Sequence, residues 1–356
     1  MDSTAVSPAA DRRSMLGRFL LSLVLAAFFL WLAWRGLAGE VEDERGFASA
    51  VWTSMQGVGW SAVVVYALLF LALHLARMLR WSAQVMSLGV ERRSQVLRVA
   101  AVGYGAILLF PLRLGEFVRP YLLARETKVG FVQAMGTAVV ERIIDGLLMS
   151  LLLFAGLALA AHAPGPVVVS AGWIALGVFV AALVAVVLFT WQRGWLSRVL
   201  ASTAGRASPR LAEALTRLLS AFAEGVGSLR RGRALSAFLG WTLVYWGINA
   251  YAIAWLAQAF GLGLTLWQAA GVLAVLVVGI MVPAGPGFLG NFQYFLAAGV
   301  GLYLPDAGSG AQIMGLALTM HAIQVVVQCG VALPAWYMTM RRATPSLADD
   351  RASDLE

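Results

Sequence analysis

The stretch that decides the fold is Phe110-Pro111-Leu112-Arg113-Leu114-Gly115-Glu116-Phe117-Val118-Arg119-Pro120. It follows an apolar run, residues 99–110, and brings a proline, a glycine and three ionisable side chains together within nine residues. In a soluble protein this pattern is typical of a loop. Inside a bilayer a charged residue costs about 2.5–3.5 kcal/mol on insertion scales, and broken backbone is tolerated only where protein or a wet cavity covers it. If the chain around it lies in a membrane, the stretch predicts a functional site.

The composition places the stretch in a membrane. Of 356 residues 60% are hydrophobic and 12% are charged, whereas soluble domains carry about 25% charged residues. The net charge of +8 comes mainly from arginines between apolar segments, the positive-inside pattern of membrane proteins rather than a nucleic-acid footprint. Cys329 is the only cysteine, so a disulfide framework and a thiolate metal site are excluded. We expect an all-α, polytopic membrane protein with no cofactor and no nucleic-acid partner.

Apolar runs separated by arginine clusters predict about six full crossings. They are residues 19–38, 60–79, 133–161, 167–191, 235–260 and 313–338. The acidic loop 40–44 is suited to the outer side, and the arginine-rich loop 77–98 to the cytoplasm. We therefore expect residues 1–18 to be a cytoplasmic segment, 19–342 a single transmembrane domain, and 343–356 a disordered cytoplasmic tail.

Between the second and third crossings, and between the fifth and sixth, the pattern predicts broken hairpins. The first, residues 96–123, has basic residues on both sides, so both its ends are expected in the cytoplasm. The second, residues 264–304, is interrupted by Pro283-Ala284-Gly285-Pro286-Gly287-Phe288-Leu289-Gly290-Asn291 and is expected to have both ends outside. Paired Gly/Pro interruptions in two halves point to the binding site of a transporter with an inverted repeat. The alternative is two ordinary proline kinks. A further segment, residues 208–229, has a stripe of leucines among arginines and is expected to lie in the membrane interface.

Four motifs carry a family resemblance. They are Arg77-x-x-Arg80-Trp81, Pro111-x-Arg113-x-Gly115-Glu116-x-x-Arg119, Glu141-Arg142-x-x-Asp145 and Pro283-x-x-Pro286-Gly287-x-x-Gly290. In this order they resemble the transmembrane region of the lysylphosphatidylglycerol synthase family, described as flippase-like bacterial and archaeal membrane proteins. The resemblance covers most of the chain. It departs from the family where Ala106-Ile107 replaces an asparagine, and where Gln293 replaces a glutamate, which argues against proton coupling at that position. The aminoacyl-transferase domain of the eponymous synthases is not expected here.

The resemblance and the chemistry together predict a site for an anionic lipid headgroup. A guanidinium group offers a planar fork of donors that matches phosphate, and a helix beginning after the turn adds free N–H groups. The expected headgroup-binding residues are Arg113, Glu116, Arg119, Arg77, Arg80, Gly287, Gly290, Asn291 and Gln293. Glu116 would orient one arginine or exchange a proton. The alternative is an arginine–glutamate pair that only satisfies itself.

Further polar residues inside the predicted crossings need partners. Glu141, Arg142 and Asp145 are expected to pair with Arg77, Arg80, Arg113 or Arg119, either as a structural salt-bridge network or as a proton relay. His321, Gln324 and Gln328 share one helical face and are expected to line the pathway, although a lone histidine is more often a satisfied core group. Asn249 and Gln258 are expected to form interhelical hydrogen bonds.

These residues favour a transporter that moves an anionic lipid, or a lipid-linked phosphate, between leaflets of the cytoplasmic (inner) membrane. The second hypothesis is a membrane enzyme that modifies a lipid with Glu116 or Asp145 as acid or base, although no catalytic motif is present. The third is an accessory subunit that binds lipid or an enzyme of envelope biosynthesis through the basic stretch 193–233.

Overall fold

The computed structural model describes residues 8–38, 44–158, 160, 166–207, 209–230, 232–281, 285–304 and 310–343. The described residues form α-helices and short 3-10 helices (η), and no strand occurs among them. In chain order they are α1 (Pro8–Ala38), α2 (Glu44–Gln56), α3 (Trp60–Met86), α4 (Arg93–Leu109), η1 (Pro111–Phe117), α5 (Val118–Glu126), α6 (Phe131–Ala158), α7 (Pro166–Ala207), α8 (Pro209–Val226), η2 (Gly227–Leu229), α9 (Gly232–Ala259), α10 (Leu266–Gly279), η3 (Pro286–Phe288), α11 (Asn291–Gly301) and α12 (Gly310–Ala343). The expected tail after residue 343 lies outside the described residues.

Six helices match the six expected crossings. Four of them are long and apolar enough to cross a membrane by composition alone, at Leu20–Ala38, Trp60–Met86, Gly172–Gln192 and Gly310–Arg341. The other two, α6 and α9, have 28 residues each, and at 1.5 Å per residue each is about 42 Å long, more than the bilayer core of about 30 Å. The all-α, polytopic membrane fold is confirmed.

Both expected interruptions are present as breaks between short helices. In the first hairpin, α4 ends at Leu109 and the chain turns through η1 into α5, with Pro111 at the start of η1. Arg98 on α4 forms an ion pair with Glu126 on α5 and joins the two arms. In the second hairpin α10 and α11 flank η3. Gly287 in η3 and Gly290 just before α11 have φ values of 68° and 84°. These are left-handed conformations that glycine adopts without a steric penalty.

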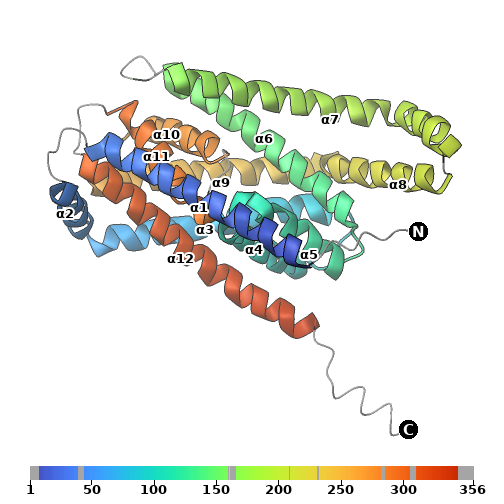
Figure 1. Cartoon of the computed structure of the whole chain (residues 1–356), viewed down its shortest axis with the longest axis horizontal. Helices are drawn as coiled ribbons and strands as arrows, with labels where there is room; N and C mark the ends of the chain where they lie inside the picture. The colour runs from blue at the N-terminus through green and yellow to red at the C-terminus, as the bar shows by residue number, and fades with distance from the viewer. Residues whose placement is uncertain are drawn as a thin grey trace, which may run out of the picture.

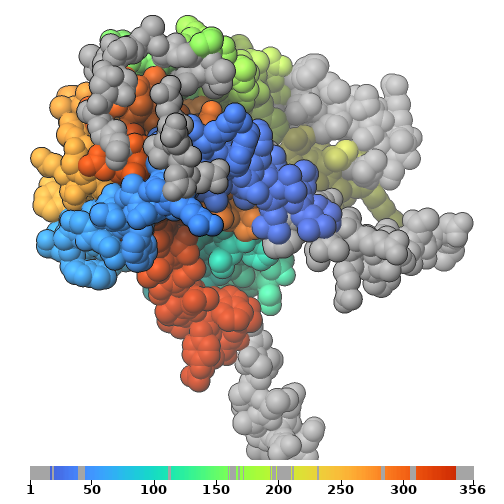
Figure 2. All heavy atoms as spheres, turned by 60° about the vertical axis from the view of Figure 1, so that its left-hand side comes forward, coloured from blue at the N-terminus to red at the C-terminus, as the bar shows by residue number. Residues whose placement is uncertain are grey.

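The two hairpins enter the bundle from opposite ends and meet (Figure 1). The hydroxyl of Ser87, just after α3, donates to the carbonyl of Ser228, just before α9, over 2.6 Å. The end of α3 therefore lies beside the beginning of α9, so the two helices are antiparallel. The first hairpin follows α3 and the second follows α9, and η1 packs against η3. Helix α1 contacts both breaks, and Figure 2 shows α1 on the same face of the molecule as α2 and the end of α12.

The basic stretch after the fourth crossing is helical rather than a loop. Helix α7 continues past the expected end at residue 191 to Ala207, and α8 folds back to pack against α6 and α7 (Figure 1). A Cβ on Gly225 would lie 2.0 Å from the carbonyl oxygen of Gln133, so only glycine permits this α6–α8 contact. The segment expected at 208–229 is thus α8, residues 209–226, together with η2, and it packs on two helices of the bundle.

Candidate functional site

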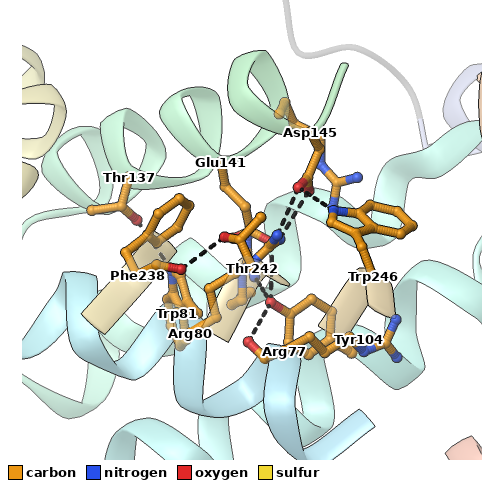
Figure 3. A network of polar contacts seen from close by, with 12 residues as sticks. Arg77, Arg80, Trp81, Tyr104, Thr137, Glu141, Asp145, Phe238, Thr242 and Trp246 are labelled. Atoms are coloured by element: carbon orange, nitrogen blue, oxygen red, sulfur yellow. Dashed lines mark hydrogen bonds and ion pairs between the residues drawn. The ribbon is translucent and has the colours of Figure 1, made fainter. Parts of the chain in front are cut away.

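A buried ion-pair network joins α3 to α6 (Figure 3). The guanidinium group of Arg80 binds Asp145 through two contacts, Nη1 to Oδ1 at 2.6 Å and Nη2 to Oδ2 at 2.8 Å. Its Nη2 also lies 2.8 Å from Oε1 of Glu141. Glu141 and Asp145 are one helical turn apart, so both carboxylates face the same arginine. Arg80 is 1% exposed, and every close charged partner it has comes from another helix.

A second arginine, from the first hairpin, completes the network. Arg119 Nη2 lies 2.9 Å from Oε2 of Glu141, and Nη1 donates to the hydroxyl of Tyr104 over 2.5 Å. The Arg119 guanidinium group also lies over the ring of Trp81, 4.6 Å from its centroid. Trp81 in turn donates its indole N–H to Thr137. Arg119 is buried with its charge matched inside the protein, and it is not among the residues that line the cavity described below.

The formal charges of this network cancel, because two arginines face two carboxylates. The indole N–H of Trp246 on α9 donates to Oδ1 of Asp145 over 3.1 Å and ties a third long helix to it. The sequence predicted pairing of Glu141 and Asp145 with arginines, and the partners are Arg80 and Arg119. A buried pair held by several hydrogen bonds fixes the relative positions of its elements, here α3, α5 and α6.

Next to this network lies a cavity of about 150 Å³. One part of its wall is polar and charged, with residues from α3, α4, α6 and α9. The other part is apolar and comes from α10 and the second hairpin, including Leu273, Leu276, Val277, Ile280 and Phe288. Arg77, Arg80 and Arg142 line the charged wall together with Glu141 and Asp145. The cavity therefore combines a charged wall of net positive charge with an apolar wall, which is the polarity pattern of an amphiphile. No group of three or more His, Cys, Asp or Glu among the described residues is placed to hold a metal ion.

Arg77 is the cavity arginine without a close carboxylate. Its Nη2 donates to Nδ1 of His74 and to Oε1 of Gln328, both at 2.7 Å, and its guanidinium group lies 4.2 Å from the ring centroid of Tyr104. None of the described carboxylates lies within 4.0 Å of it. Neutral groups thus orient Arg77 without cancelling its charge.

Arg142, like Arg77, is a cavity arginine whose charge no described carboxylate at hydrogen-bond distance neutralises. It lines the cavity from α6, and its Nε lies 3.9 Å from Oε1 of Glu116 in the first break, with both side chains about 30% exposed, at 31% and 27%. A separation of 3.9 Å is beyond hydrogen-bond distance. Arg113, which the sequence placed at the same site, lies in η1, but its side chain is outside the described part of the structure.

The polar residues of the second break form a separate cluster. His321 on α12 accepts through Nδ1 from Nε2 of Gln293 at 2.9 Å and donates from Nε2 to the carbonyl oxygen of Gly287 at 2.7 Å. The backbone N–H of Gly290 donates to Oε1 of Gln293 at 2.8 Å. Gly287, Gly290, Asn291 and Gln293 do not line the cavity, whereas Phe288 does, with a positive φ of 59° that is rare outside glycine.

Of the three polar residues expected to share one face of α12, Gln324 and Gln328 reach the cavity. Gln324 donates from Nε2 to the hydroxyl of Tyr66 over 2.9 Å, and Gln328 holds Arg77; both line the cavity. The sequence predicted that the three residues share one face, and the structure gives each of them a partner outside α12. His321 contacts the second break, and the two glutamines contact α3.

Sequence reasoning missed several residues of the site. Tyr104, Tyr245 and Trp246 line the cavity, and aromatic residues in an apolar helix carry no signal that separates them from the core. Asn249 and Gln258 were expected to make interhelical hydrogen bonds. The prediction is wrong, because neither side chain has a hydrogen bond among the described residues; Asn249 lines the cavity and Gln258 is exposed.

Comparison with known proteins identifies a family and no individual relative. No curated protein matches the chain, and no solved structure matches it. The family described as the lysylphosphatidylglycerol synthase TM region matches residues 16–332, which include both hairpins, the ion-pair network and the cavity. The chain belongs to the family of lysylphosphatidylglycerol synthase transmembrane regions.

Proposed function

We propose that the protein moves a phosphate-bearing lipid between the leaflets of the cytoplasmic membrane and holds the headgroup in the cavity between α3, α6, α9 and the two hairpins. The observation that carries this proposal is the cavity itself. Arg77 and Arg142 supply cationic donors on one wall, and α10 and Phe288 supply an apolar surface on another. A guanidinium fork suits phosphate oxygens, and the apolar wall suits the first atoms of an acyl chain.

The charge in and around the cavity supports an anionic ligand. Among the described side chains, Arg77, Arg80, Arg119 and Arg142 stand against Glu116, Glu141 and Asp145, which leaves one positive charge. An uncompensated charge inside a membrane protein is costly. An anionic headgroup beside Arg77 removes that cost, and this provides binding energy specific to the loaded state.

The cavity size supports a mechanism with moving hairpins. A volume of about 150 Å³ is close to that of an engineered cavity that takes up one benzene molecule, so it accommodates a headgroup and not a whole lipid. Passage of the lipid therefore requires the two breaks to separate. Because the hairpins enter from opposite ends, opening beside one or the other exposes the site to alternate leaflets. Helix α1 begins and α12 ends at one end of the bundle (Figure 1), and we place that end in the cytoplasm because of the arginine-rich connections.

A flip assay tests this proposal. The purified full chain is placed in liposomes that contain a fluorescent acyl-labelled phosphatidylglycerol, and dithionite quenching measures how much label changes leaflet. Wild-type protein is expected to move the label. Arg77→Met is expected to lower the rate at least tenfold, since it removes the cation but keeps most of the volume, and Arg77→Lys is expected to retain part of the rate.

Arg92→Gln is the matched control, because Arg92 is an exposed arginine outside the cavity, and its rate should equal that of the wild type. Label that is chemically altered during the assay would contradict transport and favour a lipid-modifying enzyme. Label that binds tightly without changing leaflet would favour a lipid-binding accessory subunit. Equal transport rates for Arg77→Met and wild type would show that the cavity takes no part in transport.

A further inference from the structure

Part of the cavity wall consists of side-chain amides, and the proposed binding of phosphate by Arg77 and Arg142 assigns them no ligand. Asn249 lies on α9, one turn after Trp246, and its side chain faces the cavity without a hydrogen-bond partner among the described residues. An unpaired amide in a largely apolar bundle is unfavourable unless a ligand or water meets it. Asn249 is therefore available to a ligand, whereas Arg80 and Arg119 are not.

Two glutamines add free hydrogen-bonding atoms to the same cavity. Gln328 uses Oε1 to accept from Arg77, so its amide N–H groups remain available. Gln324 uses Nε2 to donate to Tyr66, so its carbonyl oxygen remains available. With the two ends of the Asn249 amide, the cavity offers both neutral donors and neutral acceptors.

From this we infer that Asn249, Gln324 and Gln328 form a subsite for a hydroxyl-bearing substituent on the phosphate, so that the ligand is a polyol or sugar phosphate ester with an uncharged headgroup substituent. The inference rests on the proposed function and specifies its substrate class. A hydroxyl group both donates and accepts, which matches a mixed set of amide atoms. An ammonium group only donates, and it would restore the excess positive charge that the phosphate beside Arg77 removes. Amine-bearing headgroups are therefore disfavoured, with Asn249 as the selecting residue.

Equilibrium binding of three labelled lipids tests the inference. Phosphatidylglycerol, phosphatidate and phosphatidylethanolamine with identical fluorescent acyl chains are titrated with the purified full chain in detergent micelles. Wild-type protein is expected to bind phosphatidylglycerol about tenfold more tightly than phosphatidylethanolamine. Asn249→Leu should lower phosphatidylglycerol affinity about tenfold, the effect of one to two lost hydrogen bonds, and should change phosphatidate affinity less than twofold.

Two further variants keep the test decisive. Asn249→Asp has nearly the same shape but offers only acceptors and a negative charge, so it should shift the preference toward phosphatidylethanolamine. Gln258→Leu is the matched control, since Gln258 is an exposed amide near the end of the same helix and does not line the cavity; it should bind all three lipids as the wild type does. Excess glycerol 3-phosphate distinguishes the source of the headgroup, because it should displace little labelled lipid if the ligand is a membrane lipid.

Equal affinities of wild-type protein for phosphatidylglycerol and phosphatidylethanolamine would overturn the inference, as would equal weakening of phosphatidylglycerol and phosphatidate by Asn249→Leu. Displacement by glycerol 3-phosphate as effective as by the unlabelled lipid would also overturn it, in favour of a soluble ester. Failure of all three labelled lipids to bind would instead contradict the proposed function itself.

Discussion

At the residue scale, the arginines divide into two groups that the sequence does not distinguish. Arg80 and Arg119 are buried and bind carboxylates at 2.6–2.9 Å. Arg77 and Arg142 face the cavity with neutral or distant partners. The motifs placed all four near one site, but which arginine receives Glu141 or Asp145 depends on how α3, α5 and α6 pack, and that is a tertiary property. Arg119 thus belongs to the ion-pair network, and Arg77 and Arg142 are the arginines at which we propose the headgroup binds.

The first prediction concerns Arg80. Arg80→Met leaves Glu141 and Asp145 close together with one cation fewer, so unfolding should become easier by about 3–5 kcal/mol, the effect of breaking a buried ion pair. Denaturant unfolding in detergent, followed by circular dichroism, measures this. The double variant Arg80→Met/Asp145→Leu should recover part of the loss, and exposed Arg125→Met should change nothing. A single Arg80→Met variant as stable as the wild type would refute a structural role for the network.

At the element scale, both breaks were predictable because their signals are local. Proline, glycine and charge interrupt an apolar run, and the interruptions at Pro111 and around Pro286 appear where the pattern placed them. Helix α2 and the extension of α7 were not predicted. The first is a short helix that packs on α12 and touches α1 through Phe47 and Trp34, whose ring centroids are 4.8 Å apart. The second is supported by packing on α8. Neither contact can be read from a single segment.

The first break depends on close approach of η1 to α4. A Cβ on Gly115 would lie 2.1 Å from the carbonyl oxygen of Ala106, and backbone cannot move away as a flexible side chain can. Gly115→Ala should therefore destabilise the protein by about 1–3 kcal/mol, as overpacking does. The thermal midpoint in detergent tests this against Gly130→Ala, whose added methyl group meets nothing within 4 Å. A Gly115→Ala midpoint no lower than that of Gly130→Ala would contradict the close packing.

The second break depends on His321. His321→Leu removes its contacts with Gly287 and Gln293, so the Gly287 carbonyl and the buried Gln293 amide both lose a hydrogen-bond partner. In a Cys329→Ser background, a cysteine at exposed Leu289 beside the break should then react with maleimide about tenfold faster. A cysteine at Leu114, exposed in the first break, is the matched control and should react at an unchanged rate. Acceleration at both positions would indicate general unfolding instead of a local effect.

At the scale of the whole molecule, two hairpins from opposite ends meet beside a set of long helices (Figure 1). The sequence predicted the crossings, the hairpins and their opposite sense from hydropathy, arginine distribution and Gly/Pro interruptions. It did not predict the cavity, because a cavity is lined by residues from many elements that are far apart in the chain. Its walls combine side chains from α3, α6, α9, α10 and α12, and only their packing shows that one wall is charged and the other apolar.

The position of a lipid phosphate is the most direct test of the central claim, that the cavity between the hairpins is a headgroup site. An electron cryomicroscopy map of the full chain in nanodiscs of phosphatidylglycerol locates that phosphate. We expect phosphate density within about 4 Å of the Arg77 guanidinium group, as in a charge-assisted hydrogen bond or ion pair, with the acyl chain against α10 and Phe288. Phosphate density confined to exposed arginines such as Arg92 and Arg93, with the cavity empty of lipid, would contradict it.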